Sequence, residues 1–342
     1  MIASLSTPLL LGVFAIAGLI VVISSIKATG LADVIADRTR MGEALAGGIV
    51  LGAATSLSGI VVSVSVAAQG DASFAFSNAV GGIAAQTFFL ALADMLHRRA
   101  NLEHSAAEPA NLFQAVMLIV LLSIPLAATA APDFAIWGIS PASVVLFLAY
   151  LGGTKLATQV SETPMWKPVE TRETRRDEPE DEEEANRSPR GPIIVFMGLV
   201  VIMGLSGWVI SQAGQEFVTR FSLSSSLVGA LLTAVVTSLP ELVTTLTAVR
   251  RGALQLAIGG IIGGNTFDTL FLVFSDGAYR DGSLYHAVSM SDLYWLATGL
   301  MMTGVLLGGL ILRQKDGPAR IGIESLLLVA IYASAVVLQV LA

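Results

Sequence analysis

The sequence predicts an all-α polytopic membrane protein whose ten transmembrane helices form two inverted repeats of five helices each. Of its 342 residues, 54% are hydrophobic and only 13% are charged, and the mean hydropathy is +0.76. A soluble domain carries roughly twice that charged fraction. Apolar stretches long enough to cross a bilayer recur along the chain, and part of the first half is repeated in the second.

A transmembrane helix needs about 20 mostly apolar residues. The first such stretch lacks a basic flank before it and a small-residue cleavage site after it, so it is expected to be a membrane helix and not a signal peptide. The predicted spans are 8–27, 44–68, 73–96, 111–130, 133–152, 192–212, 226–249, 254–275, 291–312 and 320–341.

Lysine and arginine residues indicate the orientation, because short cytoplasmic loops carry an excess of them. If the chain starts outside, 17 of these residues fall on inward-facing segments and only Arg220 and Arg280 fall on outward-facing ones. This distribution predicts both termini outside and a plasma membrane location, of the bacterial inner-membrane type.

A charged segment in the middle of the chain divides the predicted protein into three parts: a first half at 1–152, a cytoplasmic linker at 153–191 and a second half at 192–342. The linker holds four prolines and the acidic run 177–184, a composition that cannot bury a core. Its spacing matches no EF-hand loop, so a solvated hinge is favoured over a calcium-sensing tail.

An internal repeat appears when the chain is laid over itself so that 47–94 aligns with 229–276, at one fixed offset and without a gap. Each half has an odd number of helices, so the second copy enters the membrane in the opposite direction. Inverted repeats with interrupted helices predict a binding site near the membrane midplane. Matched pairs include Thr55 with Thr237, Ser56 with Ser238, Leu57 with Leu239, Gly81 with Gly263, Gly82 with Gly264 and Asp94 with Asp276.

Two carboxylates, Glu241 and Asp268, lie inside otherwise apolar sequence. A charge at membrane depth costs about 2.5 kcal/mol or more and usually marks an ion or substrate pathway. Both acids stand beside helix-breaking residues, Pro240 and Gly264, where freed backbone groups can face a cavity. The alternative for either acid is a structural role, bonded to a donor at the break. Asp94 and Asp276, at opposite faces, are expected to cap helices or line vestibules.

The strings from Thr237 to Glu241 and from Gly263 to Asp268 resemble the alpha repeats of the sodium/calcium exchanger family, within the cation/calcium antiporter superfamily. That family's signature reads G-T-S-L-P-E followed by G-S-N-I-F-N/D, and the resemblance covers the whole ten-helix plan. It implies that both acids belong to a central cation site. Further oxygens would come from Ser238, from Thr237 and from the Ala234 carbonyl.

The first repeat departs from this pattern. Ser58-Gly59 stands where the family has Pro-Glu, Gln86 stands where it has Asn or Asp, and serine is missing at positions 82 and 264. Both acids therefore come from one half. Gln86 is equally compatible with a structural amide between helices, and the hydroxyls could instead bond a carbonyl one turn back. The predicted cation ligands are Glu241, Asp268, Thr237, Ser238, Ala234, Thr55, Ser56 and Gln86.

The expected function is secondary active antiport of Ca²⁺, or a related cation, against Na⁺ by alternating access. A cation/proton exchanger of the same fold, a non-transporting membrane regulator or scaffold, and a channel remain alternatives. The expected partners are inorganic cations and the lipid bilayer, without nucleic acid or a resident cofactor, and a monomer is compatible with the sequence. No enzyme signature occurs, cysteine is absent, and the three histidines are expected to be solvated near loops.

Overall fold

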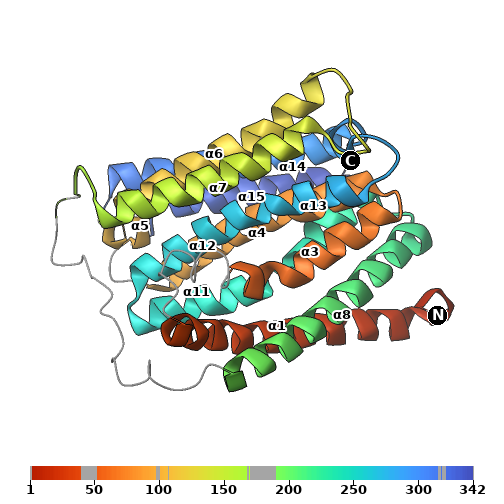
Figure 1. The fold of residues 1–342 in the computed structure, drawn as a ribbon, viewed down its shortest axis with the longest axis horizontal. Helices are drawn as coiled ribbons and strands as arrows, with labels where there is room; N and C mark the ends of the chain where they lie inside the picture. Colours follow the sequence, from red (N-terminus) through yellow and green to blue (C-terminus); the bar gives the residue numbers. More distant parts are fainter. Residues whose placement is uncertain are drawn as a thin grey trace.

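The computed structural model describes residues 2–39, 52–97, 101–106, 108–167, 169, 190–314, 317 and 321–341. These residues are almost wholly helical (Figure 1), and their one β feature is the isolated bridge between Ile136 and Ile139. Most of the predicted linker (168 and 170–189) and the predicted start of the second span (44–51) lie outside the described residues, as do Arg98, Arg99, Lys315 and Arg320.

Five membrane-crossing segments make up each half. The first half contains α1 (Thr7–Thr39), α3 (Gly52–Ala68), α4 (Ala72–His97), α6 (Pro109–Ala130) and α7 (Pro141–Glu162), with the short α5 (Leu102–Ser105) between α4 and α6. The second half contains α8 (Arg190–Phe221), the chain α9 (Ser225–Leu227), η4 (Val228–Thr233), α10 (Ala234–Thr237) and α11 (Leu239–Arg251), then α12 (Leu254–Asp268), α13 (Leu270–Ala278), η5 (Leu284–His286), α14 (Met290–Leu312) and α15 (Ile323–Leu341).

Within the described residues, eight helices are long and apolar enough to cross a membrane, and the bent pair formed by residues 225–251 adds a ninth. The remaining predicted span, 44–68, corresponds to α3, whose described part is shorter. The protein is therefore an integral membrane protein with the predicted order of spans.

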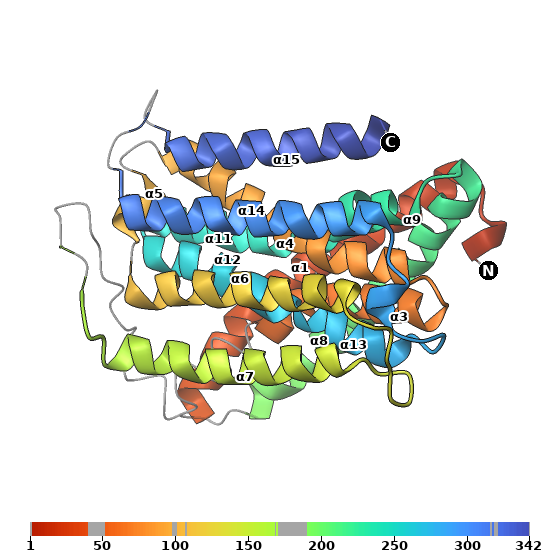
Figure 2. The same cartoon turned by 90° about the horizontal axis from the view of Figure 1, so that it is seen from above.

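Equivalent helices of the two halves begin at positions separated by the same offset that aligns the two repeats in the sequence. Helix α4 begins at Ala72 and α12 begins at Leu254, while α7 begins at Pro141 and α15 begins at Ile323. The equivalent helices run in opposite directions because each half has five spans. In Figure 2 one end of the bundle carries both chain termini and the other carries the C-terminal end of α7, next to the predicted linker in the sequence. We call these the terminal end and the linker end.

One predicted span is displaced. The sequence predicts a helix over 133–152, but α7 runs from Pro141 to Glu162, so its last ten residues fall inside the predicted linker. Ser140 caps the helix and Pro141 occupies its first turn, a position that suits proline because no N–H is needed there. The preceding loop contains apolar residues such as Trp137, which is 91% exposed, and these residues raised the hydropathy of a non-helical segment.

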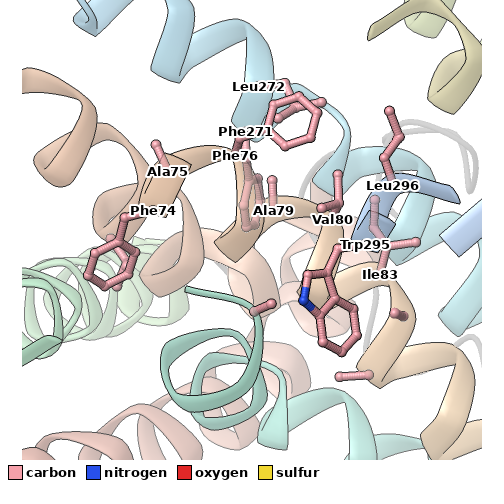
Figure 3. Packing of buried hydrophobic residues seen from close by; sticks show 14 of the residues in the cluster. Phe74, Ala75, Phe76, Ala79, Val80, Ile83, Phe271, Leu272, Trp295 and Leu296 are labelled. Atoms are coloured by element: carbon pink, nitrogen blue, oxygen red, sulfur yellow. The ribbon is translucent and has the colours of Figure 1, made fainter. Parts of the chain in front are cut away.

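Helix α4 forms the centre of the bundle and is buried along most of its length. Figure 3 shows Phe76 of this helix near Phe271 of α13, and Ile83 near Trp295 and Leu296 of α14. Small residues on the same helix let neighbouring backbones approach closely, as is usual where membrane helices pack. They are Ala75, Ala79, Gly81, Gly82, Ala84 and Ala85.

An aspartate caps the connection at each end of the bundle. Asp94 Oδ1 accepts the Leu102 N–H at 2.9 Å, and Asp276 Oδ1 accepts the Leu284 N–H at 2.9 Å. Leu102 and Leu284 are themselves equivalent at the offset of the repeat. Both aspartates therefore have the predicted capping role.

The expectation of solvated histidines is wrong for His104, which is 8% exposed and whose Nδ1 lies 2.7 Å from the Arg313 carbonyl oxygen. Its repeat partner His286 likewise bonds a backbone carbonyl, that of Ala131, at 2.8 Å. Sequence position beside a loop did not reveal that these loops fold back onto the ends of neighbouring helices.

We expect Gly81→Ala to destabilise the protein by about 1–3 kcal/mol, the usual cost of overpacking. A Cβ at this position would lie 2.5 Å from the Ala230 Cα, which belongs to the backbone of η4 and cannot rotate away. Thermal unfolding in detergent would measure the effect. Gly308→Ala in α14 is the matched control, because its Cβ would meet nothing within 4 Å. Equal melting temperatures for the two variants would contradict this packing.

Candidate functional site

A break in the second span of the second half places Glu241. The segments 225–237 and 239–251 are bent by 43° at Ser238. Pro240 lacks the N–H needed to continue the helix and follows directly after the break. Glu241 thus lies in the first turn of α11, where the helix dipole favours a negative charge. Its side chain is 5% exposed.

A second break places Asp268 at the end of α12, directly before α13 begins at Leu270. The side chain is 2% exposed, and its Oδ2 accepts a hydrogen bond of 2.6 Å from Gln86 Nε2 of α4. Positions 86 and 268 are equivalent in the two repeats. Equivalent residues can touch only at the pseudo-two-fold axis, so this contact marks the axis of the inverted repeat.

Both acids line one small cavity of about 10 Å³, the smallest space in which a single water-sized particle fits. It lies between α3, α4, the break before α11 and the end of α12. The lining residues are Ser56, Gly59, Asn78, Gly82, Gln86, Thr237, Ser238, Glu241, Asp268 and Phe271.

The predicted hydroxyl and carbonyl ligands differ in their availability. Thr55 lies within hydrogen-bonding reach of Glu241, whereas Ser56 lies close to Asp268 without completing a hydrogen bond. Ser238 Oγ lies 3.4 Å from Gln86 Nε2 and faces the cavity.

The remaining two predicted ligands are engaged within their own helix. Thr237 Oγ1 donates to the Thr233 carbonyl at 2.9 Å. This bond to a carbonyl one turn back is the alternative role that the sequence allowed for the hydroxyls. The Ala234 carbonyl already accepts the Ser238 N–H at 3.0 Å.

Several oxygen acceptors at the cavity have no hydrogen-bond donor among the described residues: Glu241 Oε2, Asp268 Oδ1 and Gln86 Oε1. Buried polar atoms are rarely left without a partner, and an unpaired charge in an apolar interior is costly. The two carboxylates also lie close enough to repel each other. A donor-poor group of carboxylate and amide oxygens is suited to a hard cation.

Side chains from the opposite repeat fill the places where the family pattern is broken. A Cβ on Gly59 would lie 2.6 Å from Phe271 Cε2, so the Phe271 ring occupies the volume that an acid at position 59 would need. A Cβ on Gly264 would lie 3.3 Å from Gln86 Oε1. The Phe271 ring therefore lies where an acid at position 59 would be, and the Gln86 amide lies close to where a serine side chain at position 264 would be.

Six of the eight predicted ligands line the cavity: Ser56, Gln86, Thr237, Ser238, Glu241 and Asp268. Sequence reasoning missed Asn78, which lies two helical turns before Gln86 on the same face of α4. Its amide ties the surroundings together, donating to Ser63 Oγ at 2.9 Å and accepting from Thr233 Oγ1 at 2.7 Å. A polar residue in an otherwise apolar helix was the available signal.

The model of the sodium/calcium exchanger protein family matches residues 9–154 and 190–341 of the chain. Curated relatives include an uncharacterized membrane protein of Methanocaldococcus jannaschii, 30% identical over 107 residues, which are 30% of this chain and 33% of the relative. The sodium/calcium exchanger MaX1 of Methanosarcina acetivorans is 26% identical over 114 residues, or 33% of this chain and 30% of that protein. The matched segments thus span about a third of the length of these relatives.

Solved structures resemble the whole chain in fold. The H⁺/Ca²⁺ exchanger CAX superposes with a TM-score of 0.65 at 14% identity, covering 97% of this chain and 86% of that one. The sodium-calcium exchanger NCX_Mj, soaked with Na⁺ and Sr²⁺, gives a TM-score of 0.63 at 17% identity, covering 97% and 99%.

We expect Gly59→Ala to destabilise the protein and Phe271→Ala to relieve that effect, because the new methyl group would collide with the Phe271 ring. Melting temperatures of both single variants and the double variant form a mutant cycle. The expected coupling is about 1 kcal/mol or more, as is typical for residues in contact. Additive effects would show that the ring does not occupy the space beside position 59.

Proposed function

Because the chain belongs to the sodium/calcium exchanger protein family, we propose that it is a secondary active cation antiporter. It exchanges Ca²⁺, or a related divalent cation, for Na⁺ at the cavity between Glu241 and Asp268. It is a transporter and not an enzyme. The observation that carries the proposal is the set of buried carboxylate and amide oxygens without donors at the meeting point of the two repeats.

Glu241 and Asp268 are the proposed charged ligands. Gln86 Oε1 and the hydroxyls of Ser56 and Ser238 are the proposed neutral ligands, all of them at the cavity. Thr55 supports Glu241, while Thr237 and the Ala234 carbonyl shape the break that presents it. Two carboxylates balance the charge of one divalent cation or two monovalent cations.

Competition for the same two carboxylates supports coupled exchange. An ion bound at Glu241 and Asp268 excludes the other ion, and without an ion two charges face each other in a low-dielectric interior. That arrangement disfavours reorientation of the carrier without an ion. The intact group of acceptors also favours a transporter over a scaffold that has lost its ligands.

A cation/proton exchanger is the second candidate, because two carboxyl groups can accept two protons as readily as two Na⁺ in charge terms. The fold supports either ion, since it is shared with both a sodium-calcium exchanger and an H⁺/Ca²⁺ exchanger. The orientation proposed from the sequence, with the linker in the cytoplasm, makes the linker end the cytoplasmic face.

We expect ⁴⁵Ca²⁺ uptake into proteoliposomes to follow an imposed Na⁺ gradient and to fall at least about tenfold in Glu241→Gln and in Asp268→Asn. The loss of one charged ligand exceeds the ~1.4 kcal/mol that a tenfold change represents. Uptake driven by a pH gradient alone, without Na⁺, would identify the proton exchanger instead.

The matched controls are Glu216→Gln and Asp281→Asn, which remove acids that lie outside the cavity. Both should transport as the wild type does. Calorimetry tests the scaffold alternative separately. If Ca²⁺, Na⁺ and Mn²⁺ all fail to bind in a manner that depends on Glu241, the antiporter proposal is wrong.

A further inference from the structure

A second group of buried acids lies at the linker end, away from the central cavity. Asp94 lies in the last turn of α4, Glu103 belongs to α5 and Glu324 belongs to the first turn of α15. With Asn101 these residues form what we call the linker-end cluster. Asp94 is 2% exposed, Glu103 is 0% exposed, Glu324 is 4% exposed and Asn101 is 2% exposed.

Only some of the side-chain oxygen atoms in this cluster accept a hydrogen bond. Asp94 accepts the N–H groups of Leu102 and Gly322, at 2.9 and 3.2 Å, and Glu324 Oε1 accepts Asn101 Nδ2 at 2.7 Å. Neither carboxyl oxygen of Glu103 has a hydrogen-bond donor in the described chain, and neither does Asn101 Oδ1.

The Glu103 and Glu324 carboxyl groups lie within hydrogen-bonding reach of each other. Two ionised carboxylates offer only acceptors to each other and repel. A hydrogen bond between them needs a proton on one of the two.

Among the described residues, the charged groups around Glu103 do not offset its negative charge. Asp94 faces it from α4 and Glu324 faces it from α15, and both are acidic. His104 on α5 and Arg313 at the end of α14 bond each other's backbone carbonyls at 2.7 and 3.1 Å. Helices α12 and α14, which also contact α5, carry their only charged residues at their other ends. Among the described residues, no cation forms an ion pair with Glu103 or Glu324.

The equivalent cluster at the terminal end shows what is missing. At the offset of the repeat, Glu103 corresponds to Tyr285 and Asp94 corresponds to Asp276. There the Tyr285 hydroxyl lies 2.8 Å from Ser143 Oγ, which in turn donates to Asp276 Oδ2 at 2.7 Å. Backbone N–H groups of Ser140 and Leu284 and the Ser143 hydroxyl, all of them neutral, donate to this buried aspartate. At the linker end a carboxyl group takes the place of the tyrosine hydroxyl.

We propose that Glu103 and Glu324 share one proton, so that the linker-end cluster is a proton-binding site distinct from the central cavity and a pH-sensitive latch of α5 and α15 on α4. The proton makes Glu103 a neutral hydroxyl donor, as Tyr285 is at the other end. A metal ion does not fit as well, because no group of three His, Asp or Glu side chains among the described residues is arranged to hold one.

The ionisation behaviour of Glu103 agrees with this assignment. Burial raises the pKa of Glu103 well above its ordinary value, and the charges of Asp94 and Glu324 raise it further. The folded protein therefore binds this proton more tightly than the unfolded chain does. Stability contributed by the protonated pair is complete below the unfolded pKa and is lost as the pH rises toward the folded pKa.

The test compares melting temperatures of the full-length protein in detergent from about pH 5 to pH 9. The wild type should lose on the order of 2–4 °C per pH unit relative to Glu103→Gln across part of this range. Glu324→Gln should remove the same slope, and the double variant should add little, because one proton is shared. Glu162→Gln, an exposed acid at the same end, should behave as the wild type does.

Infrared spectroscopy provides a direct readout. One protonated-carboxyl band present in the wild type at neutral pH should be absent from Glu103→Gln and retained in Glu162→Gln. The central acids are present in all these proteins and cancel in the difference. The test does not use transport, so its outcome is independent of the proposed function.

Three outcomes would overturn the proposal. The first is an unchanged pH slope, or an unchanged infrared band, in Glu103→Gln. The second is failure of both glutamine variants to fold near pH 5, where a neutral amide should replace a protonated acid. The third is stabilisation of the wild type by Ca²⁺ or Mg²⁺ at alkaline pH that disappears in Glu103→Gln, which would assign the site to a metal ion.

Discussion

The structure depends on the burial of Glu241 and Asp268 in an interior that offers them few donors. In a low-dielectric medium two such charges repel strongly, and removing each from water costs several kcal/mol. The fold offsets part of this cost through the Gln86 amide, the Thr55 hydroxyl and the N-terminal turn of α11. The remainder is not offset by any donor among the described residues, and the helix breaks and the small residues of α4 leave a small space beside both acids.

The inverted repeat determines where that space lies. Gln86 and Asp268 are equivalent positions and bond each other, so the cavity lies on the axis that relates the halves. The two repeats then need not be identical in chemistry. Phe271 fills the space beside Gly59, and the Gln86 amide faces Gly264, so a glycine that departs from the family signature in one repeat faces a larger group in the other. The site keeps its packing while its charge becomes one-sided.

The order of helices, the repeat and the central acids could be predicted from the sequence, because each leaves a signal in hydropathy, spacing or cost of burial. The position of α7 could not, since an exposed loop containing Trp137 is as apolar as a span. Nor could the blocked space beside Gly59, which depends on the Phe271 ring of the opposite repeat. Asn78 and His104 were missed for the same reason: their partners come from distant segments, and only the packed structure brings them together.

The two ends of the bundle share one backbone contact and differ in chemistry. At each end an aspartate accepts the N–H of an equivalent leucine at 2.9 Å, so the connections are held in the same way. The surrounding hydroxyls of Tyr285 and Ser143 at the terminal end are neutral over the whole physiological range, whereas Glu103 and Glu324 are acids. Symmetry in the backbone therefore does not impose symmetry in response. An inverted repeat can therefore carry a pair of buried acids at one end alone while both ends keep the same aspartate contact.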